Sequence, residues 1–133
     1  MKTSKKFRLL AAAAAIGVAM TLPGGGTLLA ADDGYTVISK LETFNELLVG
    51  PRITDPKDEA NFFVVNNDGT LNGTWHGKTL TGTWRWDDAF FCRVLTAPRP
   101  APEDCQQWAL ADDKARLVRE RGTGKTADYV VRK

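Results

Sequence analysis

Two cysteines are the residues of this 133-residue sequence with the clearest chemical meaning. Cys92 and Cys105 form its only cysteine pair, and in an oxidising compartment such a pair is expected to be bridged. The bridge would close a loop of about 14 residues and contribute roughly 3 kcal/mol to stability. A metal site built with the single histidine, His76, is the competing interpretation, but it has three ligands and no C-x-x-C spacing. We predict a disulfide and no metal site.

The stretch 119–126, RERGTGKT, resembles a nucleotide-binding motif. It ends like a P-loop, but the first glycine of that motif would fall at Arg119. Gly122, Gly124 and Ala127 also match a dinucleotide fingerprint, yet too few residues follow for a βαβ unit. We interpret the stretch as a hairpin turn with a basic flank, and we predict no cofactor.

Other residue types that could support catalysis are poorly placed for it. A Ser-His-Asp triad lacks a suitable nucleophile, because Ser39 is the only serine after residue 31 and stands at the start of a predicted helix. The acidic pairs 87–88 and 112–113 fall between predicted strands, where aspartate favours turns. With both cysteines bridged, no thiolate nucleophile is left. We predict that the protein is not an enzyme, and an enzyme of unknown type stays as an alternative.

Aromatic and arginine side chains form the remaining candidate site. The patterns Gly73-x-Trp75 and Gly82-x-Trp84 resemble the G-x-W signature of lipocalin-type barrels, in which a tryptophan closes one end of a ligand-filled lumen. Aromatic faces with a few guanidinium groups are also typical of a mostly apolar pocket with oriented polar contacts. Ordinary core tryptophans are the competing interpretation. The candidate ligand-binding residues are Trp75, Trp84, Trp86, Arg85, Arg93 and Trp108.

Charge is unevenly distributed along the chain. Four of the 18 bases lie in the first 31 residues, which contain no acid, and this leaves 14 bases against 16 acids. That balance excludes a generally basic protein that coats nucleic acid. Residues 114–133 nevertheless hold seven bases and two acids, which indicates either two solvated faces of a hairpin or a docking patch for an anionic partner. Five of the seven mark this basic end: Lys114, Arg116, Arg119, Arg121 and Lys125.

Residues 1–31 have the three-part pattern of a secretory signal peptide. A basic stretch over 1–8 precedes an apolar run over 9–22, and small residues lead to Ala31. A retained membrane anchor is the competing interpretation. The apolar run of about 14 residues argues against it, because roughly 20 are needed to span a bilayer. We expect cleavage near Ala31, and a periplasmic or secreted protein whose residues 32–133 form one small β domain without a membrane span.

One helix is expected to precede the strands that position these residues. Its apolar stripe of Leu41, Phe44, Leu47 and Leu48 predicts a helix over 39–49. A capping box is expected at its start, formed either by Ser39 with Glu42 or by Thr43 with Glu46.

Short apolar runs separated by turn residues predict strands for the rest of the chain. Seven or eight such strands favour a mainly β fold, a small antiparallel meander that closes as a barrel or folds as a sandwich. The proline-rich stretch 97–102 between two of them is expected to run extended and stiff. The predicted strands cover 61–66, 70–75, 78–86, 89–96, 104–110, 114–121 and 127–132, with an edge strand over 52–54.

An internal repeat predicts strand register. The segment TLNGTW at 70–75 recurs as TLTGTW at 79–84, and a two-residue turn at His76-Gly77 would join the copies as a hairpin. Gly73 then faces Leu80 and Leu71 faces Gly82, as expected inside a tightly curved sheet. The turn at 67–69 likewise sets Val65 against Leu71 and Phe63 against Gly73. Phe62 and Val64 would face the other way, under the apolar stripe of the helix.

Several short motifs together resemble a family of small exported proteins from marine and photosynthetic Alphaproteobacteria. They are the D-G-T turn at 68–70, G-T-W-x-W at 82–86, F-C-R at 91–93 and the second cysteine, Cys105. The resemblance covers residues 36–132 and implies an oxidised cysteine pair, a small β-rich fold and no established activity. Some members carry the label dihydrodipicolinate reductase, which implies a cytoplasmic Rossmann enzyme that uses NAD(P)H. We treat the label as a misnomer, because this chain has neither the length nor the βαβ pattern for that fold.

Together these features predict an exported, non-catalytic β protein that binds a small ligand or another exported protein. The alternative is an inhibitor of a secreted protease, in which the stiff segment 97–102 plugs the active site. No nucleic-acid partner is expected.

Overall fold

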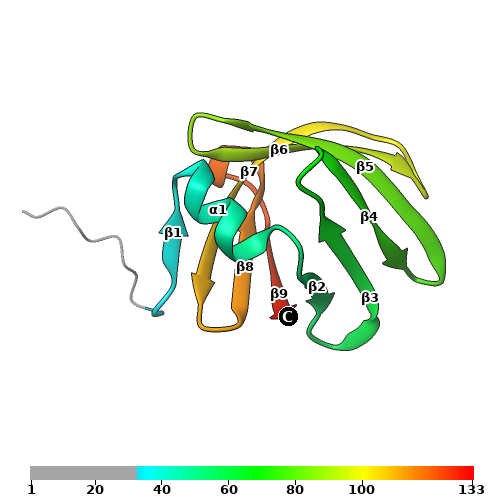
Figure 1. Ribbon diagram of the computed structural model, residues 1–133, viewed down its shortest axis with the longest axis horizontal. Coiled ribbons are helices and arrows are strands. Elements are labelled where there is room, and N and C mark those ends of the chain that lie inside the picture. The colour runs from blue at the N-terminus through cyan, green and yellow to red at the C-terminus, as the bar shows by residue number, and fades with distance from the viewer. Residues whose placement is uncertain (1–32) are drawn as a thin grey trace, which may run out of the picture.

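The computed structural model describes residues 33–133, which form an eight-stranded antiparallel β-barrel with two short helices (Figure 1). The predicted signal peptide, residues 1–31, lies outside the described residues. In chain order the elements are β1 (Thr36–Ile38), α1 (Leu41–Leu48), β2 (Arg52–Asp55), β3 (Asp58–Val65), β4 (Thr70–Trp75), β5 (Lys78–Asp87), β6 (Phe90–Ala97), β7 (Ala101–Ala111), β8 (Lys114–Val118), α2 (Arg119–Gly122) and β9 (Thr126–Arg132).

The barrel is a meander closed on itself. Strands β2 to β9 each pair with the next along the chain, and β2 also pairs with β9, where Ile53 faces Val131. The structure therefore confirms the antiparallel β prediction and decides for the barrel over the sandwich. The segment predicted as an edge strand, 52–54, lies between two partners instead, because closure leaves β2 no free edge. The short β1 was not predicted; it pairs with β7 over Trp108–Leu110, beyond the end of the β6–β7 pairing.

The hairpin register follows the internal repeat as predicted. Leu71 pairs with Gly82 and Gly73 with Leu80 across β4 and β5, and Phe63 pairs with Gly73 across β3 and β4. A Cβ atom on Gly73 would lie 2.1 Å from the carbonyl oxygen of Phe62, and one on Gly82 would lie 2.3 Å from that of Val94. The strands approach too closely at these two positions for any other residue, so the glycines permit the tight curvature.

Helix α1 covers one end of the barrel and packs into it. Phe44 and Leu48 are fully buried, whereas Leu41, predicted in the same stripe, is 39% exposed. The prediction that the stripe covers Phe62 and Val64 is wrong, because the stripe packs against the inward-facing aromatic side chains. Phe62 lies instead under the Arg52 guanidinium, whose carbon is 4.0 Å from the centre of the ring. Neither predicted capping box forms, since Lys40 is the N-cap and makes no side-chain capping bond.

Two connections differ from their predicted form. The predicted strand 114–121 ends at Val118, because Glu120 and Arg121 take left-handed backbone angles that reverse the chain within α2. The β8–β9 connection is thus a hairpin turn, as predicted for 119–126. The proline-rich stretch does not run extended throughout: β6 ends at Ala97 and β7 begins at Ala101, so Pro98–Pro100 make the β6–β7 turn.

Candidate ligand-binding site

A cavity of about 430 Å³ opens at the end of the barrel opposite α1. Its wall comes from the hairpins β4–β5, β6–β7 and β8–β9 together with β3. The volume lies within the roughly 300–1,000 Å³ typical of small-molecule sites. Six apolar side chains form much of the lining: Phe63, Leu71, Leu80, Phe91, Leu95 and Leu117.

Strand alternation explains why these side chains point inward. Phe91 and Leu95 lie four positions apart on one face of β6, and Leu117 pairs with Ala127 across β8 and β9. Period-two alternation places such residues on one side of the sheet, and closure makes that side the interior. The small side chain of Ala127 leaves space beside Leu117 that a larger residue would fill.

Three arginines contribute the charged part of the lining. Arg93 comes from β6, Arg99 from the proline turn and Arg119 from the first position of α2. No acidic side chain lines the cavity among the described residues. The site therefore combines an apolar interior with positive side chains, the half-buried Arg93 in the wall and the exposed Arg99 and Arg119 at the rim.

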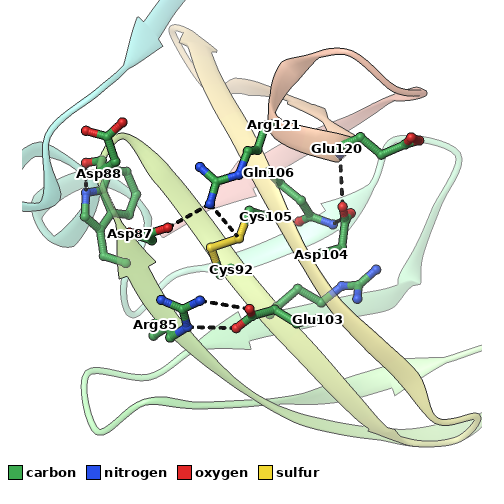
Figure 2. The surroundings of a disulfide bond; sticks show 12 residues. Arg85, Asp87, Asp88, Cys92, Glu103, Asp104, Cys105, Gln106, Glu120 and Arg121 are labelled. Carbon is green, nitrogen blue, oxygen red and sulfur yellow. Dashed lines mark hydrogen bonds and ion pairs between the residues drawn. A yellow bond between two sulfur atoms is a disulfide. The ribbon is translucent and has the colours of Figure 1, made fainter.

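Asp104 on β7 anchors the α2 turn at this rim. Its carboxylate accepts a hydrogen bond from the Glu120 backbone N–H at 3.0 Å (Figure 2). It also accepts from the Gln106 amide at 2.7 Å and from the Arg119 Nε at 3.3 Å. Burial works against ionisation, but these three donors together lower the pKa of Asp104 below its ordinary value. The bonds to Arg119 and Glu120 hold the start of α2 against β7, so Asp104 positions one of the lining arginines.

Arg93 is the most buried of the lining charges, and its surroundings compensate it poorly. Its Nη1 donates to the backbone oxygen of Pro102 at 3.1 Å. Burial lowers the pKa of the guanidinium, which the charge of Asp104 partly offsets and that of Arg119 reinforces. Arginine stays protonated in proteins all the same, so a half-buried positive charge remains in the wall. Beside it, burial raises the pKa of the Tyr129 phenol.

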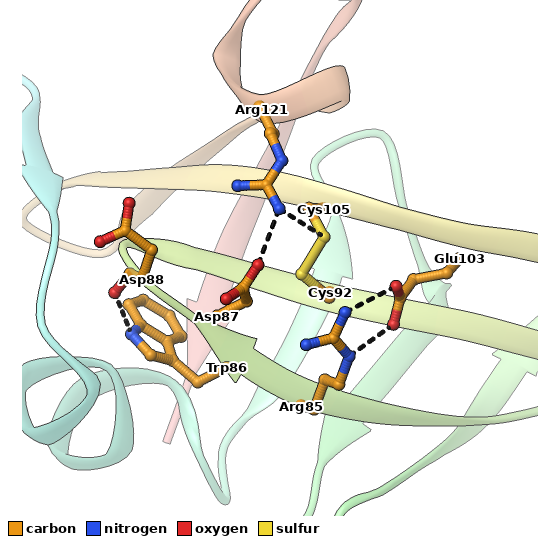
Figure 3. A network of polar contacts seen from close by, with 8 residues as sticks. All are labelled: Arg85, Trp86, Asp87, Asp88, Cys92, Glu103, Cys105 and Arg121. Carbon is orange, nitrogen blue, oxygen red and sulfur yellow. Dashed lines mark hydrogen bonds and ion pairs between the residues drawn. A yellow bond between two sulfur atoms is a disulfide. The ribbon is translucent and has the colours of Figure 1, made fainter.

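The structure divides the predicted ligand-binding residues into three locations. Trp75 and Arg93 line the cavity. Trp84, Trp86 and Trp108 lie instead around Phe44, at the end that α1 covers. Arg85 points outward from the barrel, where its guanidinium forms two 2.8 Å hydrogen bonds with Glu103 (Figure 3).

The predicted pairing of Cys92 with Cys105 is confirmed. The two residues face each other on β6 and β7 with their Cα atoms 3.8 Å apart, and their sulfurs are bonded at 2.04 Å. On the outer face, Arg121 of α2 reaches over this disulfide to the Asp87 carboxylate, 2.7 Å away (Figures 2 and 3). Asp87 and the two sulfurs lie within 4.8 Å of one another, but disulfide sulfurs are not thiolate ligands, so this group does not form a metal site.

Arginines of the basic C-terminal segment are paired with acidic side chains. Arg116 pairs with Asp33 and Asp128, and Arg121 pairs with Asp87. Arg119 is the member of this segment that reaches the cavity. Arg119 is itself paired with Asp104 at 3.3 Å, and the docking patch for an anionic partner stays a prediction.

Several residues in or beside the cavity lining were not among the predicted ligand-binding residues. Arg99 was included only as part of a proline-rich stretch, and Tyr129 was not singled out. A signal did exist for Asp104 and Gln106, because they alternate with Trp108 on one face of β7. Reading that alternation together with the register of β6 would have placed Asp104 opposite Arg93.

Comparison with protein-family models, curated proteins and solved structures finds no match to this chain. The resemblance to the alphaproteobacterial family therefore stays a prediction. Within residues 33–133, no helix has the length and apolar character required to cross a membrane.

Proposed function

We propose that this protein binds a small, mainly apolar molecule inside the barrel without transforming it chemically. The observation that carries the proposal is the cavity, which is open at one end, mainly apolar within and bounded by the closed barrel wall. A preformed apolar cavity favours binding because its occupant is removed from water and little ordering of the protein is required.

We also propose that binding takes place outside the cytoplasm. The cysteine pair supports an oxidising compartment, where such bonds persist. The predicted signal peptide gives the route, and the periplasm or the extracellular space gives the destination. Inhibition of a secreted protease through the proline turn stays an alternative prediction.

A neutral fluorescent probe, N-phenyl-1-naphthylamine, tests the binding proposal. We expect its emission to rise on mixing with the purified protein and to saturate at one probe per chain. Ala127→Phe fills the space beside Leu117 and should weaken probe binding about tenfold, which corresponds to the loss of roughly one well-buried contact.

Ala60→Phe is the matched control, because Ala60 is an exposed strand residue of β3. It should leave probe affinity unchanged. The absence of any saturable emission with the unaltered protein would overturn the proposal, and so would equal weakening by both variants when both keep the native thermal midpoint.

A further inference from the structure

The charged side chains of the cavity wall indicate a ligand that is not purely apolar. Arg93, Arg99 and Arg119 line it from three separate elements, and no acid accompanies them in the lining formed by the described residues. Elsewhere the chain after residue 31 has more acids than bases. The wall and rim of the cavity thus form a local positive site on a protein whose other residues after position 31 carry a net negative charge.

Among the three arginines, Arg93 gives the strongest indication of an anionic ligand. Asp104 stands opposite it in the β6–β7 register, but that carboxylate already accepts from Gln106, Arg119 and Glu120. Among residues 33–133, no carboxylate lies within ion-pair distance of Arg93; Pro102 supplies one neutral acceptor. The charge of Asp104 therefore offsets that of Arg93 only in part, and an incoming anion in direct contact with the guanidinium would relieve the remaining cost of burial.

We propose that the ligand is an amphiphile with one apolar chain and one anionic headgroup. The chain occupies the barrel between Phe63, Leu80 and Leu95, and the headgroup lies against the Arg93 guanidinium with Arg119 beside it. A guanidinium offers two parallel N–H donors that match the oxygens of a carboxylate or a phosphate. This inference rests on the proposed function and adds the chemical class of the ligand.

The test uses headgroups of different charge on the same ten-carbon chain. Decanoate, decyl phosphate, decanol and decylamine each displace bound N-phenyl-1-naphthylamine from the unaltered protein at pH 7. At least one of the two anions should bind about tenfold more tightly than decanol, and decylamine should bind more weakly than decanol. The comparison of decanoate with decyl phosphate then distinguishes a carboxylate from a phosphate ligand.

Arg93→Met tests the assigned residue, because methionine keeps an unbranched apolar side chain and removes the charge. It should lower the affinity for the preferred anion about tenfold and leave decanol binding unchanged. Arg85→Met is the matched control, since Arg85 is on the outer face of the neighbouring strand and pairs with Glu103. It should alter neither affinity.

The two levels of the proposal fail in different ways. Equal binding of decanol and both anions to the unaltered protein would overturn the anionic headgroup and keep the apolar cavity. Failure of all four ligands and of the probe itself would overturn the proposed function. Because the headgroup comparison needs no variant, it stays decisive even if Arg93→Met folds poorly.

Discussion

The two ends of the barrel are built from the same strands and are filled in different ways. At one end the Phe44 ring of α1 lies 5.1 Å from Phe91, 5.2 Å from Trp86 and 5.6 Å from Trp84, measured between ring centroids. At the other end the interior opens into a cavity rimmed by arginines. A close-packed end supplies stability, while the open end leaves apolar surface and charge available to a ligand.

The internal repeat shows how one motif serves both ends. Its two copies lie on β4 and β5, which run antiparallel, so their tryptophans point toward opposite ends of the barrel. Trp84 of the second copy packs against Phe44, while Trp75 of the first lines the cavity. The same residue type becomes core or cavity wall depending on whether the helix covers it.

Truncation of one aromatic residue at each end tests this contrast most strongly. Phe44→Ala removes a fully buried ring and should lower the free energy of unfolding by about 3–5 kcal/mol. Trp75→Ala removes a half-buried ring at the cavity and should cost less than about 2 kcal/mol. Urea unfolding followed by circular dichroism gives both values, and equal losses would contradict the division between a stabilising end and a binding end.

Removal of the disulfide tests how much the link between β6 and β7, in the barrel wall between the two ends, contributes to stability. The double variant Cys92→Ala/Cys105→Ala should lose about 3 kcal/mol, because the bond closes a loop across the β6–β7 turn. Reductant should lower the thermal midpoint of the unaltered protein and leave that of the double variant unchanged. If reductant leaves the thermal midpoint of the unaltered protein unchanged while a thiol reagent labels both cysteines fully, the bond contributes no stability.

Gly73 tests the close approach of strands between the two ends. Gly73→Ala places a methyl group against the Phe62 backbone and should cost about 1–3 kcal/mol, because β3 must shift away. Gly50→Ala is the comparison, since open space surrounds that position and only its backbone angle is unfavourable. Thermal unfolding of both variants measures the difference. Unchanged stability of Gly73→Ala would show that steric contact does not limit this position, whereas any loss in Gly50→Ala reports the cost of its positive φ.

The sequence predicted the strands well because local patterns determine them. Turn residues such as His76-Gly77 and the alternation around Gly73 and Gly82 set both register and curvature, and the structure confirms them. The helix was also predicted, but its predicted packing over Phe62 and Val64 was wrong, because the apolar stripe of α1 does not indicate which apolar surface it will meet. Closure through β2 and β9 depends on residues nearly 80 positions apart, which no local pattern reports.

The candidate site was predicted less well than the fold. Trp75 and Arg93 were singled out and line the cavity, whereas the other four predicted residues lie at the α1 end or outside the barrel. Residue type alone does not distinguish an aromatic side chain in the core from one in a cavity wall. The left-handed turn that brings Arg119 to the rim depends on Asp104, 15 positions earlier, so sequence proximity gave no sign of it.

The smallest expected effect concerns that turn and its dependence on pH. Asp104 has a lowered pKa in the folded protein, so its ionised form contributes stability above about pH 4, and the contribution is lost as the pH falls through the folded pKa. Asp104→Asn should therefore cost about 1–2 kcal/mol at pH 7, with a gap to the unaltered protein that narrows below about pH 4. Glu59→Gln, which removes an exposed ion pair with Arg132, should cost under about 1 kcal/mol at pH 7. Urea titrations from pH 7 to pH 3 measure both gaps, and an Asp104→Asn gap that stays constant over this range would mean that the carboxylate charge does not hold the rim of the open end.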